Sequence, residues 1–302
     1  MGEVKKILIV GLDQAGKTSI LNILQEKYNK MDNIKPTVGI ERDEITVFGF
    51  PIVTWDLGGQ EKFRKDYLKN SKYFENTDSL FFVIDAVNSS RYDEALKYFE
   101  EILGIIDNLD GKPKLVLLIH KIDPNIRDDP KIQENIKEIK DAFLTVGYEL
   151  SIYITSIYDR KTIIEAFSKT FQELISQLKP LKQLLESIVL LLKLDAAILF
   201  DENLMILNEY YRNEEIEAIC LNTVYNSIYY MTHTNPKLAE NFLGNFELVL
   251  NIKHRTKKFH FMTVELKGWL MYLLTMGEEE LDPDVVLSKF QSMAHIFEQK
   301  KW

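Results

Sequence analysis

The residues best suited to chemistry lie near the N-terminus, in the segment GLDQAGKT at residues 11–18. Gly11 and Gly16 allow the backbone to curl tightly and to turn consecutive N–H groups toward a polyphosphate. The Lys17 ammonium can place a positive charge on the β- and γ-phosphate oxygens, and the Thr18 hydroxyl can ligate Mg²⁺. We therefore expect a phosphate-binding loop in which Lys17 also serves catalysis. The residues expected to contact the phosphates are Asp13, Gln14, Ala15, Gly16, Lys17, Thr18 and Ser19.

The segments on either side of this loop decide whether the motif is meaningful. An apolar run at residues 7–10 precedes it and is typical of a buried strand, and apolar residues at helical spacing follow it from Thr18 to Tyr28. A helix that begins at the loop adds the positive end of its dipole to an anion site. The alternative is a plain glycine turn between a strand and a helix.

A second motif, WDLGGQE at residues 55–61, ends another apolar run. Asp56 can hold a Mg²⁺-bound water from the carboxyl end of a strand. Gly59 has no side chain, so its backbone N–H can come close to a γ-phosphate. Gln60 can orient an attacking water, and we expect it to act with Lys17 in catalysis. A polar turn after a strand is the alternative interpretation.

A third motif, KPTVG at residues 35–39, falls in the loop before a predicted hairpin. Thr37 can supply a second hydroxyl to Mg²⁺, and its N–H can reach the γ-phosphate. An ordinary Pro-Thr loop is equally compatible with this segment alone. The expected metal ligands are Thr18, Thr37 and Asp56.

Two further segments are suited to recognising a base. Asp123, in HKID at residues 120–123, can accept hydrogen bonds from the guanine N1–H and 2-amino groups, which adenine lacks as a donor pair. The Lys121 stem can pack over the base, and the backbone of Thr155-Ser156-Ile157 can cap the guanine O6. A charged loop after a buried strand is the alternative for HKID. The residues expected around the base are His120, Lys121, Asp123, Ser156 and Ile157, with no metal or base role for the histidine.

The elements that must position these motifs alternate between strand and helix over residues 4–178. Strand-like runs occur at 7–10, 45–48, 52–55, 80–84, 115–119 and 151–154. Helix-like segments occur at 18–28, 92–106, 132–143 and 162–178. The pattern predicts an α/β fold with a mixed, mostly parallel sheet, helices on both faces, and one antiparallel edge strand after a turn at 49–51. Such a sheet binds its ligand at the carboxyl ends of its strands, where the motifs fall.

The pattern changes near Lys179-Pro180, so we expect domains at 1–179 and 180–302. The second domain predicts the order α-β-β-α-β-β-β-α of a small α+β fold. Its expected segments are a helix at 181–193, strands at 196–200 and 205–211, a helix at 214–232, strands at 246–253, 259–266 and 269–275, and a helix that Asp282 caps. Its histidines are scattered, which predicts no catalytic centre. The basic cluster at 253–258 is expected at a solvated hairpin tip, with contact to an acidic partner or lipid headgroup as the alternative.

Composition excludes several classes of function. The chain has 302 residues, 46% of them hydrophobic, and a formal net charge of −9, which disfavours general nucleic-acid binding. The single cysteine, Cys220, fits a reducing compartment. The most apolar run, 188–192, is too short to cross a bilayer, and signals for secretion and lipidation are lacking. We therefore expect a cytoplasmic location, or a peripheral one at a membrane through partners.

Together the motifs resemble the small GTPase superfamily. The phosphate loop, Pro-Thr-Val-Gly and WDLGGQE resemble the Arf-like branch, whereas HKID, Thr-Ser-Ile and the segment 181–302 resemble the Rag GTPases. In Rag GTPases a GTPase domain precedes a roadblock/longin-like domain. The resemblance implies a Mg²⁺-dependent switch that binds GTP or GDP and hydrolyses GTP slowly, with the residues above in the stated roles. Gly-Gly-Gln in the second switch is closer to the A/B type of Rag subunit than to the C/D type.

The sequence also departs from both branches. Its first switch is Arf-like, His120 replaces the usual superfamily Asn as in Rags, and the myristoylated N-terminal helix of Arf proteins is missing. An early-branching or archaeal relative would have such a mixture. The resemblance implies dimerisation through residues 181–302, either with another Rag-like GTPase or with a second copy. It also implies GAP, GEF, effector and roadblock/longin partners.

Two other functions remain open from the sequence. A metabolic P-loop enzyme, such as a nucleotide kinase or ATPase, would prefer adenine and have an acceptor site, which Asp123 argues against. A scaffold would use its dimeric second domain while the nucleotide only stabilises the fold.

Overall fold

The computed structural model describes residues 4–24, 37–47, 50–201, 204–225, 228, 246–252, 255–266, 268–277 and 282–298. The chain divides into two compact units, residues 1–166 and residues 167–302, and each is described by itself. The predicted boundary at 179/180 lies thirteen residues after this division (179 − 166 = 13), and it stays a prediction.

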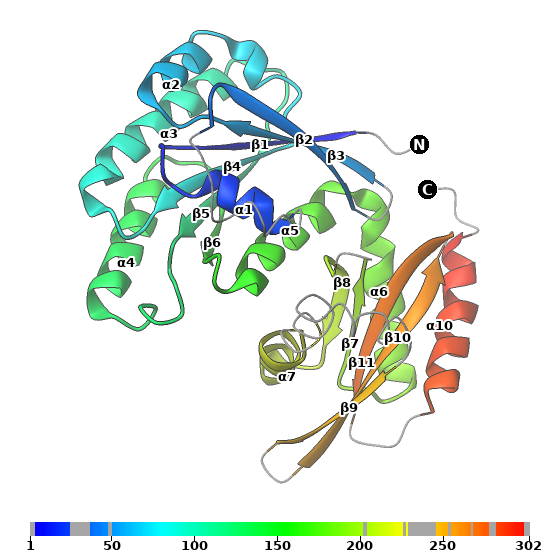
Figure 1. Ribbon diagram of the computed structural model, residues 1–302. Coiled ribbons are helices and arrows are strands. Elements are labelled where there is room, and N and C mark those ends of the chain that lie inside the picture. The colour runs from blue at the N-terminus through cyan, green and yellow to red at the C-terminus, as the bar shows by residue number, and fades with distance from the viewer. Residues whose placement is uncertain are drawn as a thin grey trace. The chain divides into compact units, whose positions relative to one another are not determined.

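The first unit is built on a six-stranded sheet in the order β2-β3-β1-β4-β5-β6 (Figure 1). Its strands are β1 Lys5–Gly11, β2 Ile40–Val47, β3 Phe50–Leu57, β4 Ser79–Asp85, β5 Lys114–His120 and β6 Leu150–Thr155. All neighbouring pairs are parallel except β2 and β3, which pair antiparallel at the edge. The predicted α/β fold, with one antiparallel edge strand, is therefore confirmed.

Helices cover both faces of this sheet because its central strands are apolar on both sides (Figure 1). They are α1 Lys17–Leu24, α2 Glu61–Leu68, α3 Tyr92–Ile106, α4 Pro130–Leu144 and α5 Arg160–Leu174. On one face Phe82 of β4, Phe99 of α3 and Phe143 of α4 pack with ring centroids 5.0–5.7 Å apart. This aromatic core fixes the strand ends from which the loops emerge.

Two details differ from the predicted elements, and the end of a third element lies outside the described residues. Helix α2, at Glu61–Leu68, was not among the expected helices. Strand β3 begins at Phe50, inside the predicted turn, and residues 48–49 lie outside the described part of the chain. Helix α1 is described only to Leu24, so the last four residues of the predicted helix at 18–28 also lie outside it.

The second unit contains an antiparallel sheet in the order β8-β7-β11-β10-β9 (Figure 1). Its elements are α6 Lys179–Leu191, β7 Ala196–Phe200, β8 Ile206–Tyr211, α7 Glu214–Ile219, β9 Phe246–Ile252, β10 Arg255–Leu266, β11 Trp269–Gly277 and α10 Pro283–Glu298. Helices α6 and α10 pack against each other and against the sheet. The predicted element order is found, and the arrangement is consistent with a roadblock/longin-like domain.

The middle of this unit departs from the expected single helix at 214–232. Helix α7 ends at Ile219 and continues as one π-helical segment, Cys220–Tyr225, and most of the remainder lies outside the described residues. The predicted cap of α10 is confirmed, since Asp282 Oδ1 accepts from the Asp284 N–H at 2.9 Å. Within the described ranges, no helix is both long and apolar enough to cross a membrane.

Candidate nucleotide-binding site

The loop between β1 and α1 takes a shape that only glycine permits at its end. Gly16 has φ +101°, a region that L residues rarely adopt. A Cβ at Gly16 would lie 2.5 Å from His120 Cδ2, so a side chain would also collide with the imidazole. The loop therefore reaches the N-terminus of α1 as a bare backbone, with its N–H groups available to an anion.

Lys17 stands in the first turn of α1 with its side chain 6% exposed. Its ammonium donates to the carbonyl oxygens of Gly11 at 3.1 Å and Leu12 at 2.8 Å. Burial lowers the pKa of Lys17 to about 8, against the opposing attraction of the Asp56 carboxylate. A desolvated cation held in this way gains strongly from a nearby phosphate.

Three oxygen-bearing side chains meet at the start of α1. The hydroxyls of Thr18 and Thr37 both donate to Asp56 Oδ2, at 2.6 and 3.0 Å, and lie 3.0 Å from each other. Asp56 is 1% exposed, and burial raises its pKa. Its Oδ1 is buried without a hydrogen-bond partner among the described residues. A hard cation prefers such oxygen donors, so the set fits Mg²⁺.

The segment after Asp56 lies directly against the phosphate loop. The Asp13 N–H donates to the Gly59 carbonyl at 3.1 Å, and the Gly58 N–H donates to the Gly39 carbonyl at 2.9 Å. A Cβ at Gly59 would lie 2.2 Å from the Asp13 nitrogen and 2.3 Å from the Leu12 carbonyl carbon. Because both are backbone atoms, no rotamer change could relieve the overlap, and glycine is required there.

A cavity of about 440 Å³ opens over these groups. It is lined by Asp13, Gln14, Gly16, Lys17, Thr18, Ser19, Thr37, Gly59, Gln60 and Lys121. Gln60 immediately precedes α2, makes no capping hydrogen bond with its side chain and lines this cavity. Lys17, Thr37 and Gln60 thus border one space of a size that suits a polyphosphate.

A second cavity, of about 450 Å³, shares Gly16, Ser19 and Lys121 with the first. It is lined by Gly16, Ser19, Asp85, Val87, Asn88, His120, Lys121, Asp123, Ile126, Ile157 and Tyr158. The two cavities therefore adjoin along the phosphate loop. One elongated ligand could place an anionic end among the glycine-loop groups and a planar end beside Asp123.

The Asp123 carboxylate is oriented from the last loop of the sheet. Ser156 Oγ donates to Asp123 Oδ1 at 2.5 Å and accepts from the Tyr158 N–H at 3.0 Å. Lys121 has φ +68°, and its ammonium reaches Asp85 Oδ2 at 2.7 Å. Ser156 thus fixes one oxygen of the Asp123 carboxylate, and Asp123 lines the second cavity.

His120 supports the phosphate loop. It is 1% exposed, its Nδ1 lies 2.9 Å from Thr155 Oγ1, and its ring lies against Gly16. Burial lowers its pKa to about 4, so the imidazole is neutral at pH 7. It also lines the second cavity, and its contact with a base stays a prediction.

Most of the predicted site residues line one cavity or the other. The exceptions are Ala15, a buried residue of the loop itself, Asp56, which accepts from the two threonine hydroxyls, and Ser156, which donates to Asp123. Lys35 and Pro36 of the third motif lie outside the described part of the chain.

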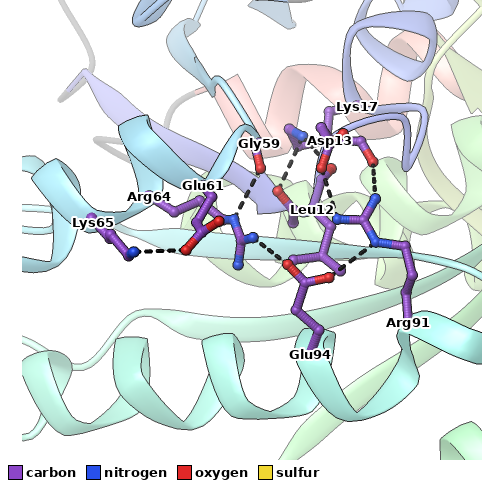
Figure 2. A network of polar contacts seen from close by, with 10 residues as sticks. Leu12, Asp13, Lys17, Gly59, Glu61, Arg64, Lys65, Arg91 and Glu94 are labelled. Atoms are coloured by element: carbon purple, nitrogen blue, oxygen red, sulfur yellow. Dashed lines mark hydrogen bonds and ion pairs between the residues drawn. The ribbon is translucent and has the colours of Figure 1, made fainter.

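The sequence analysis did not identify Arg91 and Glu94, which lie beside the site, and it gave Arg64 no role. Arg91 contacts Asp13, Arg64 contacts Gly59, and Glu94 joins the two arginines (Figure 2). The two arginines stand 27 residues apart (91 − 64 = 27) and in different elements. A glutamate three residues after Arg91 was a visible signal for a local ion pair, but no motif connected that pair to the phosphate loop.

The chain is similar to known GTP-binding proteins. A family model described as "Gtr1/RagA G protein conserved region" matches residues 6–232. The chain is 28% identical over 205 residues to Ras-related GTP-binding protein A of Dictyostelium discoideum, covering 66% of this chain and 67% of that one. It is 34% identical over 205 residues to Ras-related GTP-binding protein C of Homo sapiens, covering 65% of this chain and 50% of that one. The match thus spans half of the human relative.

A solved structure was also found. The Arl6 BBS3 small GTPase from Trypanosoma brucei, with bound nucleotide analogue GppNp, is 20% identical. The TM-score is 0.46, and the match covers 57% of this chain and 98% of that chain.

Proposed function

We propose that this chain is a molecular switch that binds GTP and hydrolyses it to GDP. It belongs to the Gtr1/RagA G-protein family of Rag-type small GTPases. The observation that carries the proposal is the pair of adjoining cavities, with the glycine loop and Lys17 in one and Asp123 in the other. This arrangement supports a guanine nucleotide with its phosphates at the start of α1. The Asp123 carboxylate selects guanine because adenine cannot donate from the equivalent ring positions.

The residues present support a magnesium-dependent reaction. Thr18, Thr37 and Asp56 would hold Mg²⁺, which neutralises charge on the β- and γ-phosphate oxygens when it is bound. Lys17 places its ammonium on the same oxygens. The orphaned Oδ1 of Asp56 supports this assignment, because a buried carboxylate oxygen without a hydrogen bond is costly unless a ligand or a bound water completes it.

Hydrolysis needs a water in line with the γ-phosphate. In this proposal Gln60 orients that water, and the Gly59 N–H approaches the phosphate. Among the described residues no arginine lines the phosphate cavity, since the guanidinium groups of Arg64 and Arg91 contact Gly59 and Asp13. The intrinsic rate is therefore slow, and a GAP-like partner accelerates it, as in other GTPases by roughly 10³–10⁵-fold.

The γ-phosphate is the signal that the switch reports. The segments around residues 37–42 and 57–67 become ordered around it and are released after hydrolysis. The hydrogen bond from the Gly58 N–H to the Gly39 carbonyl joins the two segments, which supports a coupled response.

The second unit gives the protein its partner. We propose dimerisation through residues 181–302, with another Rag-like GTPase or with a second copy of this chain, at a cytoplasmic site or at a membrane reached through partners. Effector, GAP, GEF and roadblock/longin proteins would bind this dimer. Sedimentation of the full chain at tens of micromolar tests this point: a dimer is expected, and a monomer with a folded second unit contradicts it.

Phosphate release tests the proposed activity. Purified protein with GTP and Mg²⁺ is expected to release phosphate slowly. Asp56→Asn is expected to abolish the release, because asparagine puts a neutral amide in place of the buried carboxylate. A matched control is Asp141→Asn on the exposed side of α4. Phosphate release that survives Asp56→Asn, or wild-type protein that never turns GTP over, contradicts the proposal.

A further inference from the structure

Five residues form a closed circuit of polar contacts beside the phosphate cavity (Figure 2). The members, here called the arginine circuit, are Asp13, Arg91, Glu94, Arg64 and Gly59. The hydrogen bond from the Asp13 N–H to the Gly59 carbonyl closes it at 3.1 Å. The circuit therefore connects the phosphate loop to the second switch through the first turn of α3.

Arg64 forms the switch side of the circuit. It is 7% exposed, its Nε–H donates to the Gly59 carbonyl at 2.9 Å, and its guanidinium lies 5.0 Å from the Tyr98 ring centroid. A second guanidinium nitrogen pairs with Glu94 Oε1. Because the Gly59 carbonyl accepts from both Asp13 and Arg64, this peptide is held from two sides.

Arg91 connects the arginine circuit to the phosphate loop. Its guanidinium donates to Asp13 Oδ1 at 2.8 Å and to the Asp13 carbonyl at 3.1 Å, and its Nε–H donates to Glu94 Oε2 at 3.0 Å. Burial would raise the pKa of Asp13, but the hydrogen bond and charge of Arg91 outweigh burial and hold that pKa below its ordinary value. Asp13 borders the phosphate cavity, so this pairing offsets a negative charge that would repel a phosphate.

Glu94 is the member that joins the two arginines. One carboxylate oxygen pairs with each guanidinium, so a single charge orients both cations. The Arg91 hydrogen bond, followed by that of Arg64, holds the pKa of Glu94 below its ordinary value. Its side chain is 44% exposed on α3 and does not border the phosphate cavity. In the described part of the chain, the hydrogen bonds of Glu94 lead to the nucleotide site through the two arginines.

We propose that Glu94 is a positioning residue for the γ-phosphate: through Arg64 it fixes the Gly59 peptide, and through Arg91 it fixes Asp13. This inference rests on the proposed function, in which Gly59 meets the γ-phosphate. GDP lacks the γ-phosphate, so its binding does not depend on the position of the Gly59 peptide. Loss of Glu94 should therefore reduce the preference for GTP over GDP while leaving GDP affinity nearly unchanged.

The test compares Glu94→Gln with wild type in Mg²⁺, using a non-hydrolysable GTP analogue and GDP. Glutamine keeps the shape but cannot serve two guanidinium groups as a shared anion. We expect analogue affinity to fall about fivefold to tenfold, from loss of charge-assisted contacts that are partly exposed, and GDP affinity to stay within about twofold. Glu100→Gln, an exposed position on the same helix, is the matched control and should change neither affinity. Retained GDP binding also shows that the variant is folded.

A double-mutant cycle tests the route of the effect. Arg64→Gln alone should reduce analogue affinity, and adding Glu94→Gln should reduce it little further, because Glu94 reaches the Gly59 peptide through Arg64. Additive losses, an unchanged preference in Glu94→Gln, or equal loss of both nucleotides would each overturn the inference while leaving the switch function intact. Wild-type protein that binds neither nucleotide would instead overturn the proposed function and this inference with it.

Discussion

Raising the pH should weaken nucleotide binding through Lys17. This ammonium is buried in the phosphate loop, and burial lowers its pKa from 10.5 to about 8. The phosphates of a nucleotide favour the charged form, so binding raises the pKa again. Affinity is therefore greatest below pH 8, and it falls as the pH rises through 8 toward the pKa of the complex.

The expected size follows from the protonated fraction of the free protein. With a pKa of about 8, Lys17 is roughly nine-tenths protonated at pH 7 and roughly one-tenth protonated at pH 9. Only the protonated form presents the charge, so GDP affinity should fall about tenfold between these values, and binding at pH 9 should take up about one proton per nucleotide. The ordinary value of 10.5 would give a flat profile over the same range.

Titration with a fluorescent GDP in Mg²⁺ between pH 7 and 9.5 measures this profile. Lys6 is the matched control, because burial lowers its pKa to about 8 as well, and its ammonium lies over the Trp55 ring of β3 rather than in the phosphate loop. Lys6→Gln should keep the pH dependence, whereas Lys17→Arg, which stays charged, should bind more weakly and lose it. A flat wild-type profile, or one that Lys6→Gln abolishes, would refute the reasoning.

Three other substitutions test separate parts of the site. Gln60→Leu should slow phosphate release at least about tenfold with GDP affinity within about twofold, and unchanged turnover would remove Gln60 from the mechanism. Asp123→Asn should move base preference from guanine to xanthine in a competition assay, and a variant that still prefers GDP counts against the base assignment. Gly59→Ala should impair binding of the GTP analogue more than that of GDP, because the new Cβ would lie 2.2 Å from the Asp13 nitrogen. Equal affinities for Gly59→Ala and wild type would show that the second switch does not need this close approach.

The strands of the first unit could be predicted because they carry a simple signal. β4 and β5 are buried on both faces, so each appears as a continuous apolar run that ends in a polar motif. The site motifs share this advantage, since each is contiguous and stands at a strand end. The antiparallel edge pair β2–β3 was visible through two apolar runs on either side of a turn, but the mostly exposed first half of β2, from Ile40 to Glu44, carries almost no apolar signal and was not predicted.

The features that the sequence did not predict depend on contacts between residues far apart in the chain or lack a periodic apolar pattern. Helix α2 has a strongly charged sequence, with only Arg64 and Tyr67 buried, so its apolar face gives almost no periodic signal. The contact between Arg91 and Asp13 joins residues 78 apart, which no local pattern encodes. The predicted helix at 214–232 failed to anticipate the change to π-helical bonding at Cys220, because apolar spacing does not distinguish the two helix types.

Calorimetric titration of the full chain with GDP and with ADP in Mg²⁺ tests the central claim most directly. The convergence of the phosphate loop, the threonine–aspartate set and Asp123 predicts saturable binding of one GDP per chain and no measurable heat with ADP at the same concentration. Equal binding of both nucleotides, or of neither, would contradict the claim that this chain is built around a guanine nucleotide.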